Sequence, residues 1–278
     1  MSLIIGNNGK CLQKYLMWLC VSMLCLSFAA NSQSDNLHDK WQSLLSKHVQ
    51  PINDGHSTNV DYAGFLKQRP ELKAYLKDLE NISRSTFDGW SEDKQLAFLI
   101  NAYNAWTVEL ILTKYPSLES IKDLGSFFSS PWSKSFIPLL GKTYSLDNIE
   151  HDLIRGGNKY NEPRIHFAVN CASIGCPALR EEAYTANNLD SQLEQQTERF
   201  LSDKTRNFVD DEHLNLSSIF KWYKDDFALG FRGTDSLPTF LALYENDLGL
   251  SKAEVNSLLK GKLSIKYIDY NWQLNDAN

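Results

Sequence analysis

The sequence predicts an α+β fold: a predominantly helical single domain whose long central helix packs on a small, mostly antiparallel sheet. Two observations lead to this class. Apolar residues recur at helical spacing in most segments between residues 36 and 259, and the short β-type segments come as pairs joined by tight turns. Helices that outnumber hairpin-paired strands are typical of α+β domains.

The helices follow in order from the apolar spacing. We expect them over residues 36–49, 70–82, 91–115, 146–155, 189–201, 218–227, 237–246 and 252–259. The third is the longest. Ser91 is a suitable N-cap, and Glu92 and Asp93 stand in the first turn, where the helix dipole favours acids. Tyr115-Pro116 ends it, and its apolar circumference places it across the middle of the domain.

The strands are shorter and less regular. Residues 137–140 and 143–145 flank Gly141-Lys142, which predicts a hairpin, and 207–216 predicts a second hairpin that turns at Asp211-Glu212. Residues 164–170 predict a strand before a cysteine-containing loop. A last strand over 263–274 should bury alternate side chains, namely Ile268, Tyr270, Trp272 and Leu274.

The first 29 residues have the parts of a secretory signal peptide. Lys10 and Lys14 precede an apolar run from Tyr15 to Phe28, and small residues end at Ala29, after which cleavage is expected. The alternative is an uncleaved anchor, but the run is shorter than the roughly 20 residues of a membrane span. We therefore expect a signal peptide over 1–29, one globular domain over 30–278, no membrane span after cleavage, and a periplasmic or extracellular location.

Composition excludes several function classes. Removing Lys10 and Lys14 with the signal leaves 26 basic against 34 acidic side chains, a net charge of −8. Nucleic acid binding requires a basic face, so it is not expected. The chain also has no glycine motif for phosphates or dinucleotides, which disfavours kinase, P-loop and Rossmann functions. No cofactor is expected.

The most distinctive segment runs from Arg164 to Arg180 and holds Cys171 and Cys176, the two cysteines left after signal removal. An exported protein favours a disulfide between them. Two other roles remain open: a thiol nucleophile at Cys171 activated by His166, or a zinc site built from both cysteines and His166. Two free thiols without a role are the fourth possibility. In an ideal strand His166 and Cys171 point to opposite faces, so pairing them requires a turn at Asn170.

Other polar residues are candidates for binding. Asn101 and Asn104 share one side of the apolar helix, where each either pins a loop or orients a ligand or histidine. Glu150 and His151 either reach a cleft or form a solvated helix face. Asn170, Ser173 and Arg180 complete the candidate binding set. Residues 218–227 form mainly a core stripe, and Asp225-Asp226 is only a weak cation signal.

Four sequence blocks in this order resemble the domain of unknown function 547 (DUF547). The blocks are Phe98-Leu-Ile-Asn-Ala-Tyr-Asn-Ala, Ser145-Leu-Asp-Asn-Ile-Glu-His, Arg164-Ile-His-Phe-Ala-Val-Asn-Cys-Ala-Ser-Ile-Gly-Cys-Pro-Ala-Leu and Ile219-Phe-Lys-Trp-Tyr-Lys-Asp-Asp-Phe. The resemblance is best over 90–227 and weaker at Tyr270-Asn-Trp-Gln-Leu-Asn. It implies an exported bacterial protein and no settled reaction.

The fold is also similar, distantly, to papain- and transglutaminase-like folds. Those enzymes place a nucleophilic cysteine at the start of the central helix, whereas both cysteines here follow His166 in a loop. We therefore expect a binding or interaction module, with an unknown small molecule or peptide as partner, whose loop is shaped by a Cys171–Cys176 disulfide. The alternative is a thiol-dependent hydrolase or acyltransferase with Cys171 as nucleophile, His166 as base and an asparagine orienting the imidazole.

Overall fold

The long helix that begins after Ser91 is the central element of the fold. In the computed structural model, which describes residues 36–126, 129–210 and 213–278, this helix is α6 (Glu92–Leu112). The Ser91 hydroxyl accepts the Lys94 N–H at 3.4 Å, as expected of an N-cap. Almost every α6 side chain is buried, which explains its apolar circumference.

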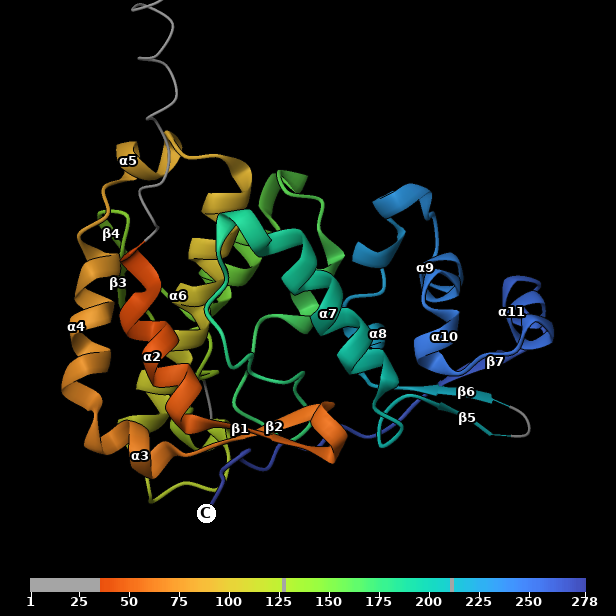
Figure 1. Ribbon diagram of the computed structural model, residues 1–278, viewed down its shortest axis with the longest axis horizontal. Coiled ribbons are helices and arrows are strands. Elements are labelled where there is room, and N and C mark those ends of the chain that lie inside the picture. Colours follow the sequence, from red (N-terminus) through yellow and green to blue (C-terminus); the bar gives the residue numbers. More distant parts are fainter. Residues whose placement is uncertain (1–35, 127–128, 211–212) are drawn as a thin grey trace, which may run out of the picture. The chain divides into compact units, whose positions relative to one another are not determined.

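Short helices surround α6 and continue to the C-terminal part of the chain. Figure 1 shows α4 lying alongside α6 and α2 lying alongside α4. The α-helices besides α6 are α2 (Asp39–His48), α3 (Tyr62–Lys67), α4 (Arg69–Glu80), α5 (Arg84–Asp88), α7 (Leu189–Ser202), α8 (Ile219–Trp222), α9 (Leu237–Leu243), α10 (Glu245–Leu248) and α11 (Lys252–Leu259). A π-helix spans Asn148–Ile154, and 3₁₀ turns include Asn36–His38, Asn53–Gly55, Ile121–Leu124, Gly156–Asn158, Pro163–Phe167, Ala186–Asn188, Asp226–Ala228 and Phe231–Gly233.

The strands form three small sheets, which completes the predicted α+β class. They are β1 (Val49–Ile52), β2 (Ser57–Val60), β3 (Ile137–Leu139), β4 (Lys142–Tyr144), β5 (Phe208–Val209), β6 (His213–Leu216) and β7 (Ser264–Tyr267). The pairs β1–β2, β3–β4 and β5–β6 are antiparallel, and β7 joins β6 in parallel. Both predicted hairpins are present, although the predicted turn at Asp211-Glu212 lies outside the described residues.

Residues 37–278 form one compact unit with two clusters of buried apolar side chains. The larger is built on α2, α3, α4 and α6 and extends to the start of α7. The smaller gathers around Phe167, the end of α7, α8 and α9, and is rich in phenylalanine. Phe167 belongs to the second cluster and Val169 to the first. The segment that carries His166 therefore runs where the two clusters meet.

The strand predicted over 164–170 is wrong, and the strand predicted over 263–274 is present only over Ser264–Tyr267. Residues 163–167 form a 3₁₀ helix because Pro163 suits its first turn and the Glu162 carboxylate caps the Arg164 N–H at 3.1 Å. The last strand ends at Tyr267, and the chain then leaves the sheet. The predicted alternation persists as far as Trp272, since Tyr270 and Trp272 are half-buried between exposed neighbours, whereas half-buried Leu274 is followed by buried Asn275.

The predicted signal peptide lies outside the described residues. Within the described part of the chain, no helix combines the length and the apolar character needed to cross a membrane.

Candidate functional site

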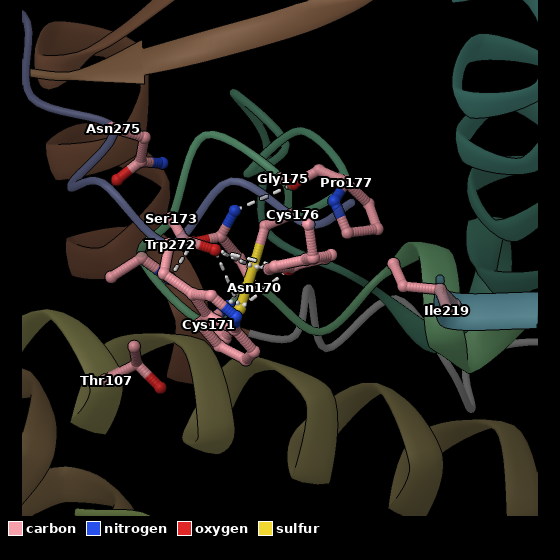
Figure 2. The surroundings of a disulfide bond; sticks show 12 residues. Thr107, Asn170, Cys171, Ser173, Gly175, Cys176, Pro177, Ile219, Trp272 and Asn275 are labelled. Carbon is pink, nitrogen blue, oxygen red and sulfur yellow. Dashed lines mark hydrogen bonds between the residues drawn. A yellow bond between two sulfur atoms is a disulfide. The ribbon is translucent and has the colours of Figure 1, made fainter. Parts of the chain in front are cut away.

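Cys171 and Cys176 form a disulfide that closes a short loop (Figure 2). Their Cα atoms lie 6.1 Å apart, and Cys176 is only 3% exposed, whereas Cys171 is half-buried. The expected disulfide is therefore present. Both sulfurs are occupied in this bond, so neither cysteine is a resting thiol nucleophile in this state.

Asn170 shapes the loop from within. Its side-chain N–H donates to the Pro177 carbonyl at 2.7 Å, and its side-chain oxygen accepts the Ala172 N–H at 2.8 Å. These bonds join the two ends of the loop around the disulfide. They also satisfy buried backbone groups that would otherwise each cost about 1–3 kcal/mol.

The two asparagines of α6 pin backbone segments, which was the first of the two roles considered for them. Asn104 donates to the Ala168 carbonyl at 2.9 Å and accepts the Asn170 N–H at 2.8 Å. Asn101 makes the same pair of bonds with the N–H and carbonyl of Tyr184, at 3.0 and 2.8 Å. Asn104 thus holds the chain immediately before the cysteine loop, while Asn101 fixes a segment farther along.

The C-terminal segment pairs with the other side of the cysteine loop. The N–H groups of Ile174 and Gly175 donate to the carbonyls of Gln273 and Asn271, both at 2.8 Å. A Cβ on Gly175 would lie 2.9 Å from the Asn271 carbonyl oxygen and from the Tyr270 ring. Glycine is therefore required for this close approach.

The pairing of the C-terminal segment with the cysteine loop places Tyr270 and Trp272 beside the disulfide. The Tyr270 hydroxyl lies 3.1 Å from the Cys171 sulfur and 3.2 Å from the Cys176 sulfur. Ser173 stands beside it, with its hydroxyl 3.3 Å from the Cys171 sulfur. Burial raises the pKa of Tyr270 well above its usual range, so its hydroxyl keeps its proton and remains a donor.

A cavity of about 220 Å³ adjoins the disulfide. Aromatic and ionisable side chains from distant parts of the sequence line it. They are Tyr103, Trp132, Asp147, Glu150, His151, His166, Val169, Cys171, Cys176, Pro177, Ile219, Trp222, Tyr223, Tyr270 and Trp272. His166 and Cys171 thus reach one cavity, because the coiled backbone removes the strand alternation that would separate them.

His166 is oriented by a carboxylate. Its Nε2 lies 2.7 Å from Asp226 Oδ2, its ring stacks on Tyr223 at 3.8 Å, and Arg155 holds the same carboxylate at 2.6 Å. Burial lowers the pKa of His166, although the interaction with Asp226 opposes the shift. Burial raises the pKa of Asp226, but the hydrogen bonds from His166 and Arg155 outweigh this effect and hold the pKa far below its usual range. The residue that orients the imidazole is thus Asp226 and not an asparagine.

Two buried polar atoms of lining residues have no hydrogen-bond partner. They are His166 Nδ1 and Glu150 Oε1. Glu150 is 6% exposed and belongs to the π-helix. Tyr103 and Tyr223 lie near it, and burial, followed by the Glu150 charge, raises the pKa of both phenols. Buried polar groups are nearly always paired, so these two atoms are candidates for contact with a bound molecule or water.

The remaining predicted residues are placed differently. His151 lines the cavity but is half-exposed, and its Nδ1 accepts from Arg155 at 2.6 Å. Arg180 does not line the cavity and instead bonds Glu182 and Gln195. Among the described residues no group of three or more histidine, cysteine and acidic side chains is arranged to hold a metal ion, so the zinc role finds no donor set here.

The sequence pattern does not single out several residues of the site. Trp132, Trp222 and Trp272 line the cavity without a sequence signal for it, and Asp226, which bonds His166, gives only a weak cation signal. The alternation of Tyr270 and Trp272 in a polar tail is the one available signal, and it equally fits the buried face of a strand.

Gly175→Ala tests the close approach of the C-terminal segment. The added methyl must displace the Asn271 backbone and the Tyr270 ring, so we expect a loss of about 1–3 kcal/mol in the free energy of unfolding. Chemical denaturation followed by tryptophan fluorescence measures it. Gly89→Ala is the matched control, because its Cβ would meet only ordinary contacts at 3.5 Å or more. Equal stability of the two variants would contradict the description of this contact.

Comparisons with known proteins give one match. No curated protein and no solved structure matches the chain, so the likeness to papain and transglutaminase folds has no support. The family model described as "Protein of unknown function, DUF547" matches residues 87–201. This range contains the first three blocks that carried the resemblance, whereas Trp222, Asp226 and Tyr270 lie beyond it. Residues 87–201 of this chain are therefore similar to the DUF547 family model, in agreement with the resemblance that the sequence blocks indicated.

Proposed function

We propose that the chain is a binding module that holds a small molecule, or one residue of a peptide, in the cavity beside the disulfide. The observation that carries this proposal is the pair of buried, unpartnered atoms, Glu150 Oε1 and His166 Nδ1. Leaving either without a partner costs about 1–3 kcal/mol, and a bound polar group would recover that cost. Pockets of this kind combine apolar walls with a few convergent polar groups.

The chemistry of the walls favours a cationic group on the ligand. Asp147 and Glu150 bring carboxyl groups, and no lysine or arginine is among the lining residues. The lowered pKa of His166 keeps its ring neutral near pH 7. Three tryptophans and three tyrosines offer ring faces, which attract cations. An ammonium group could therefore meet Glu150 while its substituent lies against the rings.

Benzylammonium is a suitable probe, with benzyl alcohol as its neutral counterpart. We expect benzylammonium to change the fluorescence of the cavity tryptophans saturably and to bind more tightly than benzyl alcohol. Glu150→Gln removes the charge but keeps the shape, so it should weaken benzylammonium binding about tenfold, equivalent to roughly 1.4 kcal/mol. Calorimetric titration gives the dissociation constants.

The control is Glu71→Gln, which removes an exposed carboxylate from α4 and should leave binding unchanged. Equal affinities for benzylammonium and benzyl alcohol would contradict the cation preference. Absence of saturable binding by either probe would contradict the cavity as an aromatic-lined ligand site.

A second candidate function, thiol-dependent acyl transfer or hydrolysis, is favoured by the orientation of His166. Its Nε2 is held by Asp226, which leaves Nδ1 as the proton acceptor in the cavity that Cys171 also lines. This requires the disulfide to be opened first. The Cys171 thiol would then give its proton to His166 Nδ1, and its sulfur would attack an acyl carbon, with Asp226 stabilising the imidazolium.

This candidate is tested with p-nitrophenyl acetate on the reduced protein. Attack by Cys171 breaks the ester bond, releases p-nitrophenolate and leaves an acetyl group on the sulfur, which peptide mass spectrometry locates. We expect His166→Ala to slow the release at least a hundredfold, within the range for a general base, and His56→Ala, outside the cavity, to leave it unchanged. If Cys171→Ser hydrolyses the ester as fast as the reduced wild type, the thiol function is wrong.

We also propose that the mature protein works outside the cytoplasm. The basic, apolar and small residues at the start of the chain support this, as does a disulfide that is stable where thiols are not kept reduced. The intact mass of protein secreted by a bacterial host tests the proposal. A chain that begins at Ala30 is the expected result, and full-length protein retained in the cytoplasm would contradict it.

A further inference from the structure

The two sulfurs of the disulfide differ in access. Cys171 is half-buried and Cys176 is only 3% exposed, although both touch the cavity. A thiol that enters the cavity therefore reaches the Cys171 sulfur first. Attack on one sulfur of a disulfide expels the other, so access selects Cys176 as the leaving sulfur.

The surroundings of Cys176 suit a leaving thiolate. The backbone N–H of Cys171 donates to the Cys176 sulfur at 2.8 Å, a donor that the Cys171 sulfur does not have. The hydroxyls of Tyr270 and Ser173 lie 3.2 and 3.5 Å from the same sulfur. Donors directed at a developing negative charge lower the pKa of the departing thiol, and a thiol of lower pKa leaves faster.

We propose that Cys171–Cys176 is an exchangeable disulfide that reacts with low-molecular-weight thiols through Cys171. The thiolate of the entering thiol attacks the Cys171 sulfur, the Cys171–Cys176 bond breaks, and its electron pair stays on Cys176. The product is a mixed disulfide on Cys171 and a thiolate on Cys176. A second thiolate then attacks the outer sulfur of the mixed disulfide, the bond to Cys171 breaks with its electron pair on the Cys171 sulfur, and the two entering thiols leave joined as a disulfide.

This proposal does not depend on the ligand-binding function. It concerns the opening of the bond, and it would supply the free Cys171 that acyl transfer needs. Exchange with a small neutral thiol does not require the cation preference of the cavity. The two proposals can therefore fail separately.

The test uses the oxidised full chain and 2-mercaptoethanol. Samples are quenched with acid at early times, remaining thiols are blocked with N-ethylmaleimide, and peptides are mapped by mass spectrometry. Mapping separates the two sites from Cys11, Cys20 and Cys25. We expect the mercaptoethanol adduct on Cys171 and the maleimide on Cys176.

Tyr270→Phe removes one donor from the leaving sulfur and should slow the exchange about threefold or more. The matched control is Tyr267→Phe, because Tyr267 lines a different cavity and should leave the rate unchanged. An adduct found first on Cys176 would overturn the assignment. A bond that stays closed in the native protein at thiol concentrations that open it in denaturant would overturn the proposal as a whole.

Discussion

The structure of the site depends on the side-chain amide of Asn104. This single group, buried on α6, binds the carbonyl of Ala168 and the N–H of Asn170 at once. A helix that is apolar almost all round can pack against other elements but cannot by itself position a loop. The amide supplies two directional bonds in a buried environment, where losing either would leave a backbone group unpaired. The two bonds hold the segment from Ala168 to Asn170, which lies between His166 and Cys171 in the chain.

A second constraint acts from the opposite side. The C-terminal segment pairs with the cysteine loop, and Gly175 allows the backbones to approach closely. The cavity therefore has one wall fixed to α6 and another supplied by the end of the chain. The carboxylates at the site differ in their hydrogen bonding. Asp226 bonds His166 and Arg155, whereas Glu150 has one oxygen without a partner. A cavity fixed from two sides has a preorganised geometry, which the proposed ligand-binding function requires.

The sequence predicted the longer helices well because their apolar spacing and caps are local signals, and Ser91 begins α6 as expected. It missed the short helices α3 and α5, and the helix predicted over 218–227 ends as an α-helix at Trp222. It also predicted the disulfide. It did not predict the conformation around His166, where Pro163 and the Glu162 cap outweigh the strand-like alternation. Nor did it predict the hydrogen bond between Ile174 and Gln273, because the sequence pattern of neither segment indicates a contact with the other. The candidate residues were therefore partly right, while only tertiary contacts bring Trp222 and Tyr270 to the cavity and Asp226 to His166.

Native-state hydrogen exchange tests the central claim, that the cysteine loop is held rigidly from both sides, most directly. The amides of Asn170, Ala172, Ile174 and Gly175 all donate within the described structure, to Asn104, Asn170, Gln273 and Asn271. The account predicts that these four amides are protected nearly as strongly as those in the middle of α6. Exchange at the rate of an unstructured loop, with α6 still protected, would contradict it.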